Sequence, residues 1–326
     1  MKRQRQQGVA VVTALLLTTL AVTIVTSLFW LQQVQVRSME NQRLQLQTRW
    51  ILRGALDLSR LVLNQDLMDS PNYTQLNGVW ATPLEETRLD DYVERERLQG
   101  ESFDATLSGR MVDAQGRYNL ANLADSTKQL NLDELAVFKR LLENLKLDSS
   151  LAQGVADLVL NATPAPNTQT TGGQTTGAQT AAAVTTTGSQ PMGLVRVEDL
   201  LAVSGFTPQA IEQLRDYVII LPVSGTTVNV NTAPAELLSA LVPGLSLSDA
   251  AAMVSARKTS YYRDTATFLA LSQMVGKQIK AKWNVKSDYF LAYSRVRLDR
   301  AALDTQSLLK RPGSIPNTTV EWIREY

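Results

Sequence analysis

The side chains that most often carry out catalysis are missing from this chain. It contains no His and no Cys, which excludes thiolate nucleophiles, Ser-His-Asp triads, imidazole bases and the usual zinc sites. One acidic cluster could act through paired carboxylates or hold a metal. Its members are Glu85, Glu86, Asp90, Asp91, Glu94 and Glu96. Because Arg88, Arg95 and Arg97 are interleaved with them, a neutralised, solvated surface is the favoured interpretation, and we expect no enzyme.

The charge balance argues against a chain built to bind nucleic acid. There are 32 basic and 31 acidic residues, a net charge of +1, whereas neutralising phosphates needs a concentrated excess of Lys and Arg. Residues 241–257 have the look of a helix-hairpin-helix, so a membrane-anchored DNA-binding or DNA-uptake protein that uses Arg257 is the alternative hypothesis. Such hairpins carry a second Gly where Ser246 follows Gly244-Leu245. A purely structural helical hairpin is therefore favoured, with no nucleic acid as partner.

The N-terminus predicts a membrane helix. Lys2, Arg3 and Arg5 precede Gly8, and residues 9–31 contain no charged side chain. As a helix these residues reach about 34 Å, enough to cross a hydrocarbon core of about 30 Å. The basic flank stays in the cytoplasm, which puts the rest of the chain on the far side of the membrane. A cleaved signal peptide is the alternative, but its apolar region is usually only about 7 to 15 residues long.

The same helix is predicted to continue far beyond the membrane. Gly54 is the one helix-breaking residue between Leu31 and Met68, and Pro71 is expected to end the helix. The prediction is a single helix over residues 9–70, about 90 Å long; a membrane anchor followed by a separate helix is the alternative. Apolar residues with helical spacing predict the face that packs on a head domain. They are Leu44, Ile51, Ala55, Leu58 and Val62.

The order of a short basic leader, Gln-Gln-Gly at positions 6–8 and an uninterrupted apolar helix resembles the N-terminus of type IV prepilins and pseudopilins. The resemblance implies that residues 1–8 are a leader, cut after Gly8 by the prepilin peptidase, and that Val9 becomes the N-methylated first residue. Most such proteins carry Glu at the fifth position after the cut, where this chain has Thr13. A carboxylate in lipid is costly unless paired, so this subunit cannot supply the acidic half of the usual contact between neighbours.

The rest of the chain predicts an α+β fold. Alternation in residues 101–119 favours a strand, a turn and a short strand, and residues 133–161 have a helical period with a break near Asp148. Strand-like runs return after Ser287. We therefore expect the long N-terminal transmembrane helix to pack on an antiparallel sheet, with a large α-helical domain inserted between its strands. The predicted boundaries are 71–122 and 287–326 for the sheet-bearing head and 123–286 for the insertion.

Two local features inside the insertion are also predicted. The tract 162–190 lacks large apolar side chains and consists almost entirely of Thr, Gly, Gln, Ala, Asn and Pro, so it is expected to be flexible. Near residue 230 an extended approach precedes a helix, with Thr232 as the expected N-cap, Pro234 in the first turn and Glu236 near the positive helix end.

Two patterns strengthen the resemblance and narrow it to the K minor pseudopilins of the type II secretion pathway. They are Asp113-Ala-Gln-Gly-Arg-Tyr-Asn-Leu-Ala-Asn-Leu and Val228-Asn-Val-Asn-Thr-Ala. A missing Glu at the fifth mature position is also typical of that family. The resemblance implies a non-enzymatic subunit at the tip of the pseudopilus, which helps initiate assembly and the export of folded proteins. Its implied partners are minor pseudopilins of the I, J and H types and the prepilin peptidase.

The same resemblance implies a location and a metal. The location is the bacterial inner membrane, crossed once, with the head in the periplasm. The metal is calcium, which family members hold with a string of acidic residues after the first insertion helix. This chain has the charge-free tract there, and calcium needs several oxygen ligands, carboxylates among them. The sequence therefore does not support calcium binding, and no other cofactor is predicted.

Overall fold

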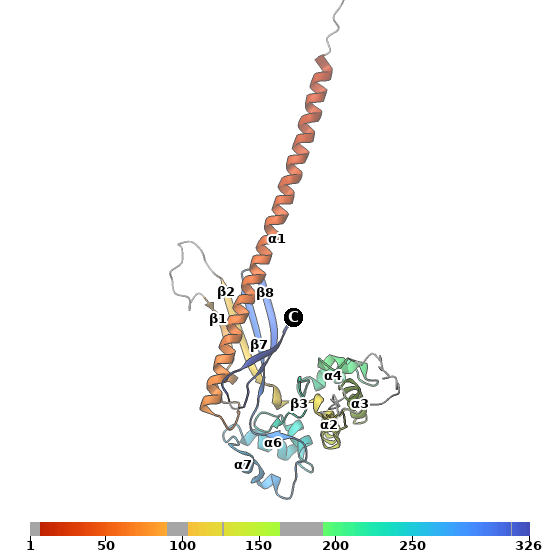
Figure 1. Cartoon of the computed structure of the whole chain (residues 1–326), viewed down its shortest axis with the longest axis vertical. Coiled ribbons are helices and arrows are strands. Elements are labelled where there is room, and N and C mark those ends of the chain that lie inside the picture. The colour runs from red at the N-terminus through yellow and green to blue at the C-terminus, as the bar shows by residue number, and fades with distance from the viewer. Residues whose placement is uncertain (1–6, 90–103, 126, 164–191, 314) are drawn as a thin grey trace, which may run out of the picture.

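The computed structural model describes residues 7–89, 104–125, 127–163, 192–313 and 315–326. Its longest element is α1 (Gln7–Asp69), a helix of 63 residues that projects far out of the head (Figure 1). The prediction of one continuous helix ending just before Pro71 is confirmed. Its N-terminal part is long and apolar enough to cross a membrane, and that part makes no burying contact within the chain.

The lower part of α1 packs on the head through a stripe that the sequence predicted only in part. The buried side chains of this stripe are Thr48, Leu52, Ala55, Leu56, Leu63 and Leu67. Of the predicted face, Ala55 is buried, but Leu58 is 49% exposed, and Leu44, Ile51 and Val62 are half-buried. The prediction was wrong about Leu58 because apolar residues surround this part of the helix, and docking on the sheet selects which of them are covered.

The head contains a five-stranded antiparallel sheet in the order β1-β2-β7-β8-β9. The strands are β1 (Leu84–Arg88), β2 (Ala105–Asp113), β7 (Tyr289–Leu298), β8 (Ala301–Lys310) and β9 (Thr319–Glu325). α1 lies along one face of this sheet, where Leu52, Ala55 and Leu56 join a core that contains Phe290 and Val296. β2 and β7 are neighbours although residues 114–288 separate them in the chain, so the prediction of a helical domain inserted between strands is confirmed.

The inserted segment is built from short helices and two small parallel strand pairs. Its helices are α2 (Leu132–Asn144), α3 (Leu151–Ala162), α4 (Pro208–Leu214), α5 (Ala235–Leu241), α6 (Leu247–Ala256) and α7 (Thr265–Leu269). Its strands are β3 (Tyr118–Asn119), β4 (Val218–Ile219), β5 (Val228–Asn229) and β6 (Trp283–Asn284). Single 3-10 turns are η1 (Val79–Ala81), η3 (Ala114–Gly116), η4 (Leu120–Leu123), η5 (Val197–Ala202) and η6 (Ser272–Met274). The strand–turn–strand prediction for residues 101–119 holds, but β3 pairs in parallel with β4 and not with β2.

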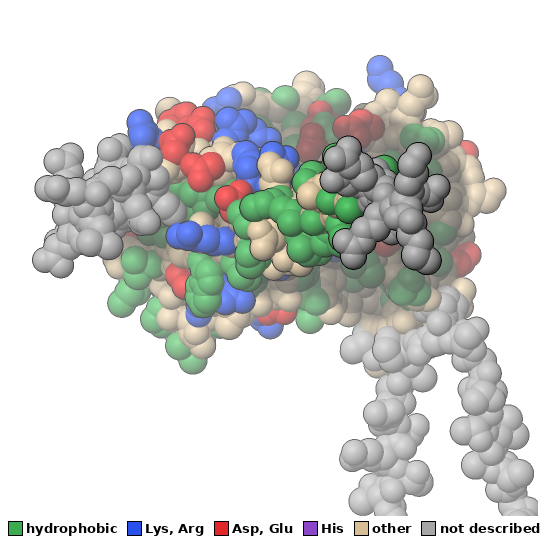
Figure 2. Space-filling view, turned by 90° about the horizontal axis from the view of Figure 1, so that it is seen from above, with side chains coloured by type: hydrophobic (Ala, Val, Ile, Leu, Met, Phe, Trp, Pro, Cys, Tyr) green, Lys and Arg blue, Asp and Glu red, His purple; other side chains and the backbone are tan. Residues whose placement is uncertain are grey.

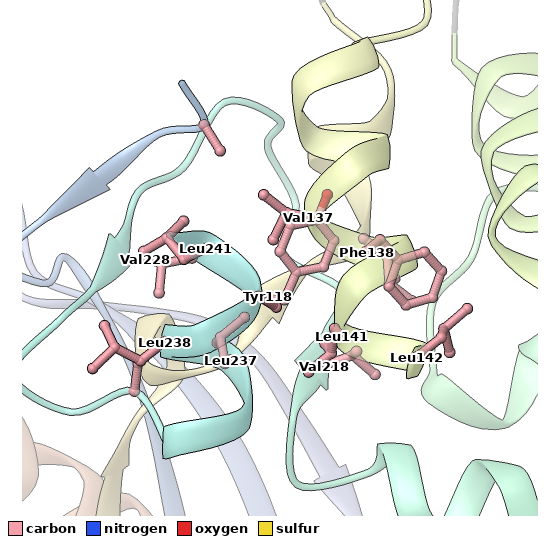
Figure 3. Close-up of a cluster of buried hydrophobic side chains, with 14 of the residues drawn as sticks. Tyr118, Val137, Phe138, Leu141, Leu142, Val218, Val228, Leu237, Leu238 and Leu241 are labelled. Atoms are coloured by element: carbon pink, nitrogen blue, oxygen red, sulfur yellow. The ribbon is translucent and has the colours of Figure 1, made fainter. Parts of the chain in front are cut away.

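One apolar core holds the inserted segment together (Figure 3). Tyr118 stacks on Phe138 of α2 with ring centroids 5.8 Å apart, and both side chains are fully buried. The labelled side chains of α5 in Figure 3, Leu237, Leu238 and Leu241, belong to the same core. The core is therefore assembled from chain segments on both sides of the 162–190 tract.

The connection before α5 differs from its prediction. Pro234, not Thr232, occupies the N-cap position of α5, and no side chain caps that helix. The Thr232 hydroxyl instead donates to Asp113. Gly244, in the turn between α5 and α6, has a positive φ of 76°, the left-handed conformation that glycine adopts at low cost.

Two predicted features lie largely outside the described residues. The flexible tract is described only at its first residues, because α3 ends at Ala162 and the description stops at Thr163. Of the acidic cluster, Glu85 and Glu86 are described. Glu86 accepts a hydrogen bond from Thr106 at 2.8 Å and lies 3.9 Å from Arg297, as expected for a neutralised surface.

Candidate functional site

The predicted processing and assembly residues lie in the first turns of α1. The backbone is helical at Gly8, Val9 and Thr13. The Thr13 side chain is exposed, and its hydroxyl donates to the Ala10 carbonyl at 3.0 Å. Because this donor is satisfied inside the helix, Thr13 can face lipid at far lower cost than a carboxylate.

The exposed surface of the upper part of α1 is apolar. Its threonines repeat the pattern of Thr13: Thr18, Thr19, Thr23 and Thr26 each donate to a carbonyl three or four residues earlier. The helix also exposes large apolar side chains such as Leu16, Leu17 and Phe29. Figure 2 looks at the head from the side on which α1 leaves it, and both basic and acidic side chains lie on this side. A helix surface of this kind needs lipid or other apolar helices around it.

A buried polar joint connects the sheet to the inserted segment. Its centre is Asp113, at the end of β2, which is only 3% exposed. Its Oδ2 accepts hydrogen bonds from Asn229 Nδ2 at 2.9 Å, Thr232 Oγ1 at 2.6 Å and Ser287 Oγ at 2.6 Å. Its Oδ1 accepts from the Gln115 backbone at 2.8 Å. Residues at the start, in the middle and at the end of the insertion therefore all donate hydrogen bonds to one carboxylate.

Burial raises the pKa of the Asp113 carboxyl, while the hydrogen bonds that it accepts oppose that rise. An ionised carboxylate in such a place is costly unless several donors surround it, and this one has four. The carboxylate is almost completely buried, and its donors come from three separate segments of the chain, so the arrangement holds those segments together.

Gln115, two residues further on, links the same segments with its side-chain amide. Its Nε2 donates to the Thr227 carbonyl at 2.8 Å, and its Oε1 accepts from the backbone of Asp288 and Tyr289. Asn119 adds another connection, because its side chain donates to the Val223 carbonyl at 2.9 Å and accepts from the Leu221 backbone at 3.0 Å. The two patterns that carry the resemblance, residues 113–123 and 228–233, thus meet in space.

A second buried cluster fixes the lower end of α1. Arg311, just after β8, has a fully buried side chain that forms an ion pair with Asp66 of α1. Its Nη2 donates to Thr74 Oγ1 at 2.8 Å and to the Ser287 carbonyl at 3.1 Å, and its guanidinium lies 4.6 Å from the Phe290 ring centroid. Burial raises the pKa of the Asp66 carboxyl, and the hydrogen bond and charge of Arg311 oppose that rise.

No pattern in the sequence indicated the role of Arg311. Arg311 lies in a connection that contains two prolines, and its neighbours in the sequence do not distinguish it from the other arginines of the chain. Its pairing with Asp66 depends on the burial of Asp66, which is a property of the folded structure. Asp113 is the first residue of one of the two sequence patterns, where it was expected only to begin a turn. Its partners are 116, 119 and 174 residues away in the chain, and a sequence without relatives contains no signal for such distances.

The described residues on which the DNA-binding and calcium-binding hypotheses depend do not lie as those hypotheses require. Arg257, which a DNA-binding hairpin would present to phosphate, is 6% exposed and donates to the Val230 carbonyl at 2.7 Å. Burial lowers its pKa to about 10. Within the described parts of the chain, no group of three or more acidic side chains is placed to hold a metal ion. Arg257 is therefore not exposed to a phosphate, and the described residues contain no cluster of three acidic side chains of the kind that calcium binding was expected to use.

Comparison with known proteins agrees with this geometry. Two family models, both described as type II secretion system protein K, match residues 116–223 and 228–286, about half of the chain. A protein K of Klebsiella pneumoniae is 28% identical over 338 residues, covering 95% of this chain and 94% of that protein. A protein K of Aeromonas hydrophila is 26% identical and covers 94% of this chain and 92% of its own length.

A solved structure has the same fold. It is the GspK-GspI-GspJ complex of the type 2 secretion system from enterotoxigenic Escherichia coli. One chain of that complex aligns with a TM-score of 0.66 and 19% identity, covering 89% of this chain and 99% of the solved one. At this identity the likeness concerns the arrangement of the helix, sheet and insertion.

Proposed function

Because this chain belongs to the protein K family of the type II secretion system, we propose that it is a non-enzymatic minor pseudopilin at the tip of the pseudopilus, where it helps initiate assembly and the export of folded proteins. The observation that carries the proposal is α1: one helix runs from Gln7 to Asp69, apolar where it would meet lipid and packed on the head at its other end. A subunit built this way joins a helical bundle in the membrane and holds its head above it.

The first part of the proposal concerns processing. The prepilin peptidase cuts after Gly8, and Val9 becomes the methylated first residue. Mass spectrometry of the protein purified from membranes should find a mature chain that begins at Val9 and carries one extra methyl group. An intact leader, or a cut near Ser27 as expected for a signal peptide, would show that the chain is not a pseudopilin of this kind.

The second part concerns location. With the basic leader in the cytoplasm, the single apolar span of α1 crosses the inner membrane, and the head lies in the periplasm. The described part of the chain needs no cysteine pairing there, since the sequence contains no Cys.

The third part concerns partners and boundaries. The solved complex contains GspI and GspJ beside GspK, which supports minor pseudopilins of the I and J types as partners of this chain, and the H type completes the proposed tip complex. We assign residues 9–70 to the helix, 71–122 and 287–326 to the pilin-like head, and 123–286 to the inserted domain. An insertion of this size would crowd identical copies stacked along a fibre, whereas the tip has open space.

Thr13 supports the tip position. A neutral side chain cannot pair with the N-terminal ammonium of a subunit above it, and nothing is lost if no subunit lies above. The exposed apolar surface of α1 still packs laterally against other helices, and the ammonium of Val9 is available to the Glu of a partner below.

The decisive experiment is Thr13→Glu, compared with Thr18→Glu, which adds the same charge five residues further along the helix. We expect neither variant to gain function, and both to initiate pseudopilus assembly less well because an unpaired carboxylate enters the membrane. Assembly is measured as pseudopilus formation and as secretion in cells that lack the native gene. If Thr13→Glu alone enters the fibre shaft, or if immunogold labelling finds the native protein along the shaft, the tip position is wrong.

A further inference from the structure

A cleft of about 700 Å³ lies between the inserted domain and the sheet face that α1 leaves uncovered. Deep in this region, Leu291 and Leu308 pack with Ile219 of β4 and with Leu221, two residues further along the chain. Polar side chains of the sheet and of the inserted domain line the rest of the cleft, and Arg324 Nη2 of β9 donates to the Val195 carbonyl of the inserted domain at 2.7 Å.

Four side chains form a single row across the open part of the sheet. The strand register places Arg110 opposite Tyr293, Tyr293 opposite Gln306, and Gln306 opposite Arg324. Adjacent strands lie about 4.8 Å apart, so three strand spacings separate the two arginines by about 14 Å. We call this set the Arg–Tyr–Gln–Arg row.

Contacts within the sheet hold the row in place. The Arg110 guanidinium lies 5.2 Å from the Tyr293 ring centroid, and the Arg324 guanidinium lies 3.9 Å from that of Trp322. Gln306 Nε2 donates to the Tyr293 hydroxyl at 2.9 Å. Stacking of a guanidinium group on an aromatic face restricts its orientation. The row therefore presents two oriented cationic groups with neutral hydrogen-bonding side chains between them.

The described residues that line the cleft carry an excess of positive charge. Six arginines and three carboxylates line it. Each carboxylate lies near one arginine: Arg295 with Asp304 at 2.6 Å, Arg215 with Glu198 at 2.9 Å, and Arg117 with Asp216 at 3.6 Å. The excess comes from the remaining arginines, Arg110, Arg196 and Arg324.

Of these three arginines, Arg196 and Arg324 repel each other. Burial, and then the charge of Arg196, lower the pKa of Arg324, while Tyr326, Glu198 and Asp199 oppose that shift. An additional anionic group beside Arg324 would relieve this repulsion and gain a charge-assisted hydrogen bond.

We propose that the cleft binds an extended acidic peptide segment, with one carboxylate on Arg110, a second on Arg324 and the intervening residues across Tyr293 and Gln306. An extended chain rises about 3.4 Å per residue, so carboxylates four residues apart are about 14 Å apart and point to the same side. A flat lipid surface cannot enter a gap walled by the sheet on one side and the inserted domain on the other. This inference goes beyond the proposed function, because it does not depend on where the subunit sits in the pseudopilus.

The experiment measures fluorescence anisotropy of labelled peptides with the full chain in neutral detergent micelles. The probe contains Asp-Val-Thr-Val-Asp, whose carboxylates have the proposed spacing. Its isomer Asp-Asp-Val-Thr-Val has the same composition with adjacent carboxylates, and Lys-Val-Thr-Val-Lys reverses the charge. We expect saturable binding of the first peptide, about tenfold weaker binding of the isomer and no binding of the basic peptide.

Variants locate the binding. Arg110→Gln and Arg324→Gln are each expected to weaken binding of the spaced peptide about tenfold. Arg53→Gln is the matched control, because Arg53 lies on α1 over the Trp50 ring and loses the same charge outside the cleft; it should bind as the native protein does. Equal binding of the two acidic isomers, equal losses in Arg53→Gln and the cleft variants, or no saturable binding would each overturn the proposal.

Discussion

At the scale of single residues, the buried carboxylate of Asp113 depends strongly on its hydrogen-bond donors. Its carboxylate is buried and accepts four hydrogen bonds from donors that belong to η3, to the middle of the insertion and to the return to β7. Removing the charge leaves those donors facing an amide that can accept fewer bonds. Each buried donor left unsatisfied costs about 1–3 kcal/mol.

Asp113→Asn is therefore expected to lower the free energy of unfolding by about 1–3 kcal/mol, with a difference that depends on pH. Because the pKa of Asp113 is raised in the folded state, its protonation stabilises the fold fully below its unfolded pKa of about 3.9, and this stabilisation is lost as the pH rises through the folded value. The native advantage over the variant should thus grow as the pH falls from 7 toward 4. Urea unfolding at several pH values measures it; an advantage that shrinks on acidification contradicts the assignment.

Gly116 lies against Thr232, where the two sequence patterns meet. A Cβ added there would lie 2.9 Å from Thr232 Oγ1 and 3.3 Å from the Thr232 backbone oxygen. Gly116→Ala should therefore destabilise the head by about 1–3 kcal/mol. Gly54→Ala is the control, since a Cβ at that helical position meets nothing within 4 Å and should stabilise α1 by about 0.5–1 kcal/mol. If Gly116 packs this closely on Thr232, thermal unfolding should show a lower melting temperature for Gly116→Ala and a higher one for Gly54→Ala.

At the scale of elements, the attachment of α1 to the sheet combines an apolar stripe with one buried ion pair. The stripe joins the core that contains Phe290 and Val296, but apolar contacts are non-directional. The Arg311 guanidinium, which also contacts Thr74 and Ser287, fixes the rotation and height of the helix at Asp66.

Arg311→Met should cost about 3–5 kcal/mol of stability, because it leaves the Asp66 carboxylate buried without its partner. Adding Asp66→Leu in the same chain should recover a large part of that loss, since an apolar pair of similar volume replaces the ion pair. Chemical unfolding of the single and double variants forms the thermodynamic cycle. Additive losses would mean that the two side chains are not coupled.

At the scale of the whole molecule, the chain between α3 and η5 connects two halves of one core. Tyr118 and Phe138 precede the 162–190 tract, and Leu237 and Leu238 follow it, yet all four belong to the same buried cluster. A break in the tract therefore leaves the core with its contacts intact.

Brief treatment with elastase, which cuts after small apolar residues, should cleave within 162–190 and leave two fragments that stay associated. Trypsin is the matched control, because residues 158–195 contain no Lys or Arg. Size-exclusion chromatography followed by denaturing electrophoresis measures both results. Resistance of the tract to elastase, or separation of the fragments, would refute the prediction that this segment is flexible and dispensable for the fold.

The sequence by itself determined the features that repeat along the chain. Twenty-three uncharged residues from Val9 specify a membrane span, the absence of helix breakers before Pro71 specifies one continuous helix, and alternation after Ser287 specifies strands. The periods of helices and strands are local properties, so they can be read without knowing what any segment contacts. The predicted processing residues Gly8 and Val9 and the assembly residue Thr13 come from the resemblance of this local order to prepilin and pseudopilin N-termini.

Only the tertiary structure decided how these elements meet. It selected Leu52 and Leu56 rather than Leu58 as the packed face of α1, turned Thr232 from a helix cap into a partner of Asp113, and buried Arg257 and Arg311. It also aligned Arg110 with Arg324 across four strands. Each outcome depends on a partner far away in the chain, and the energy of a buried charge or an apolar contact is set by what surrounds it in space.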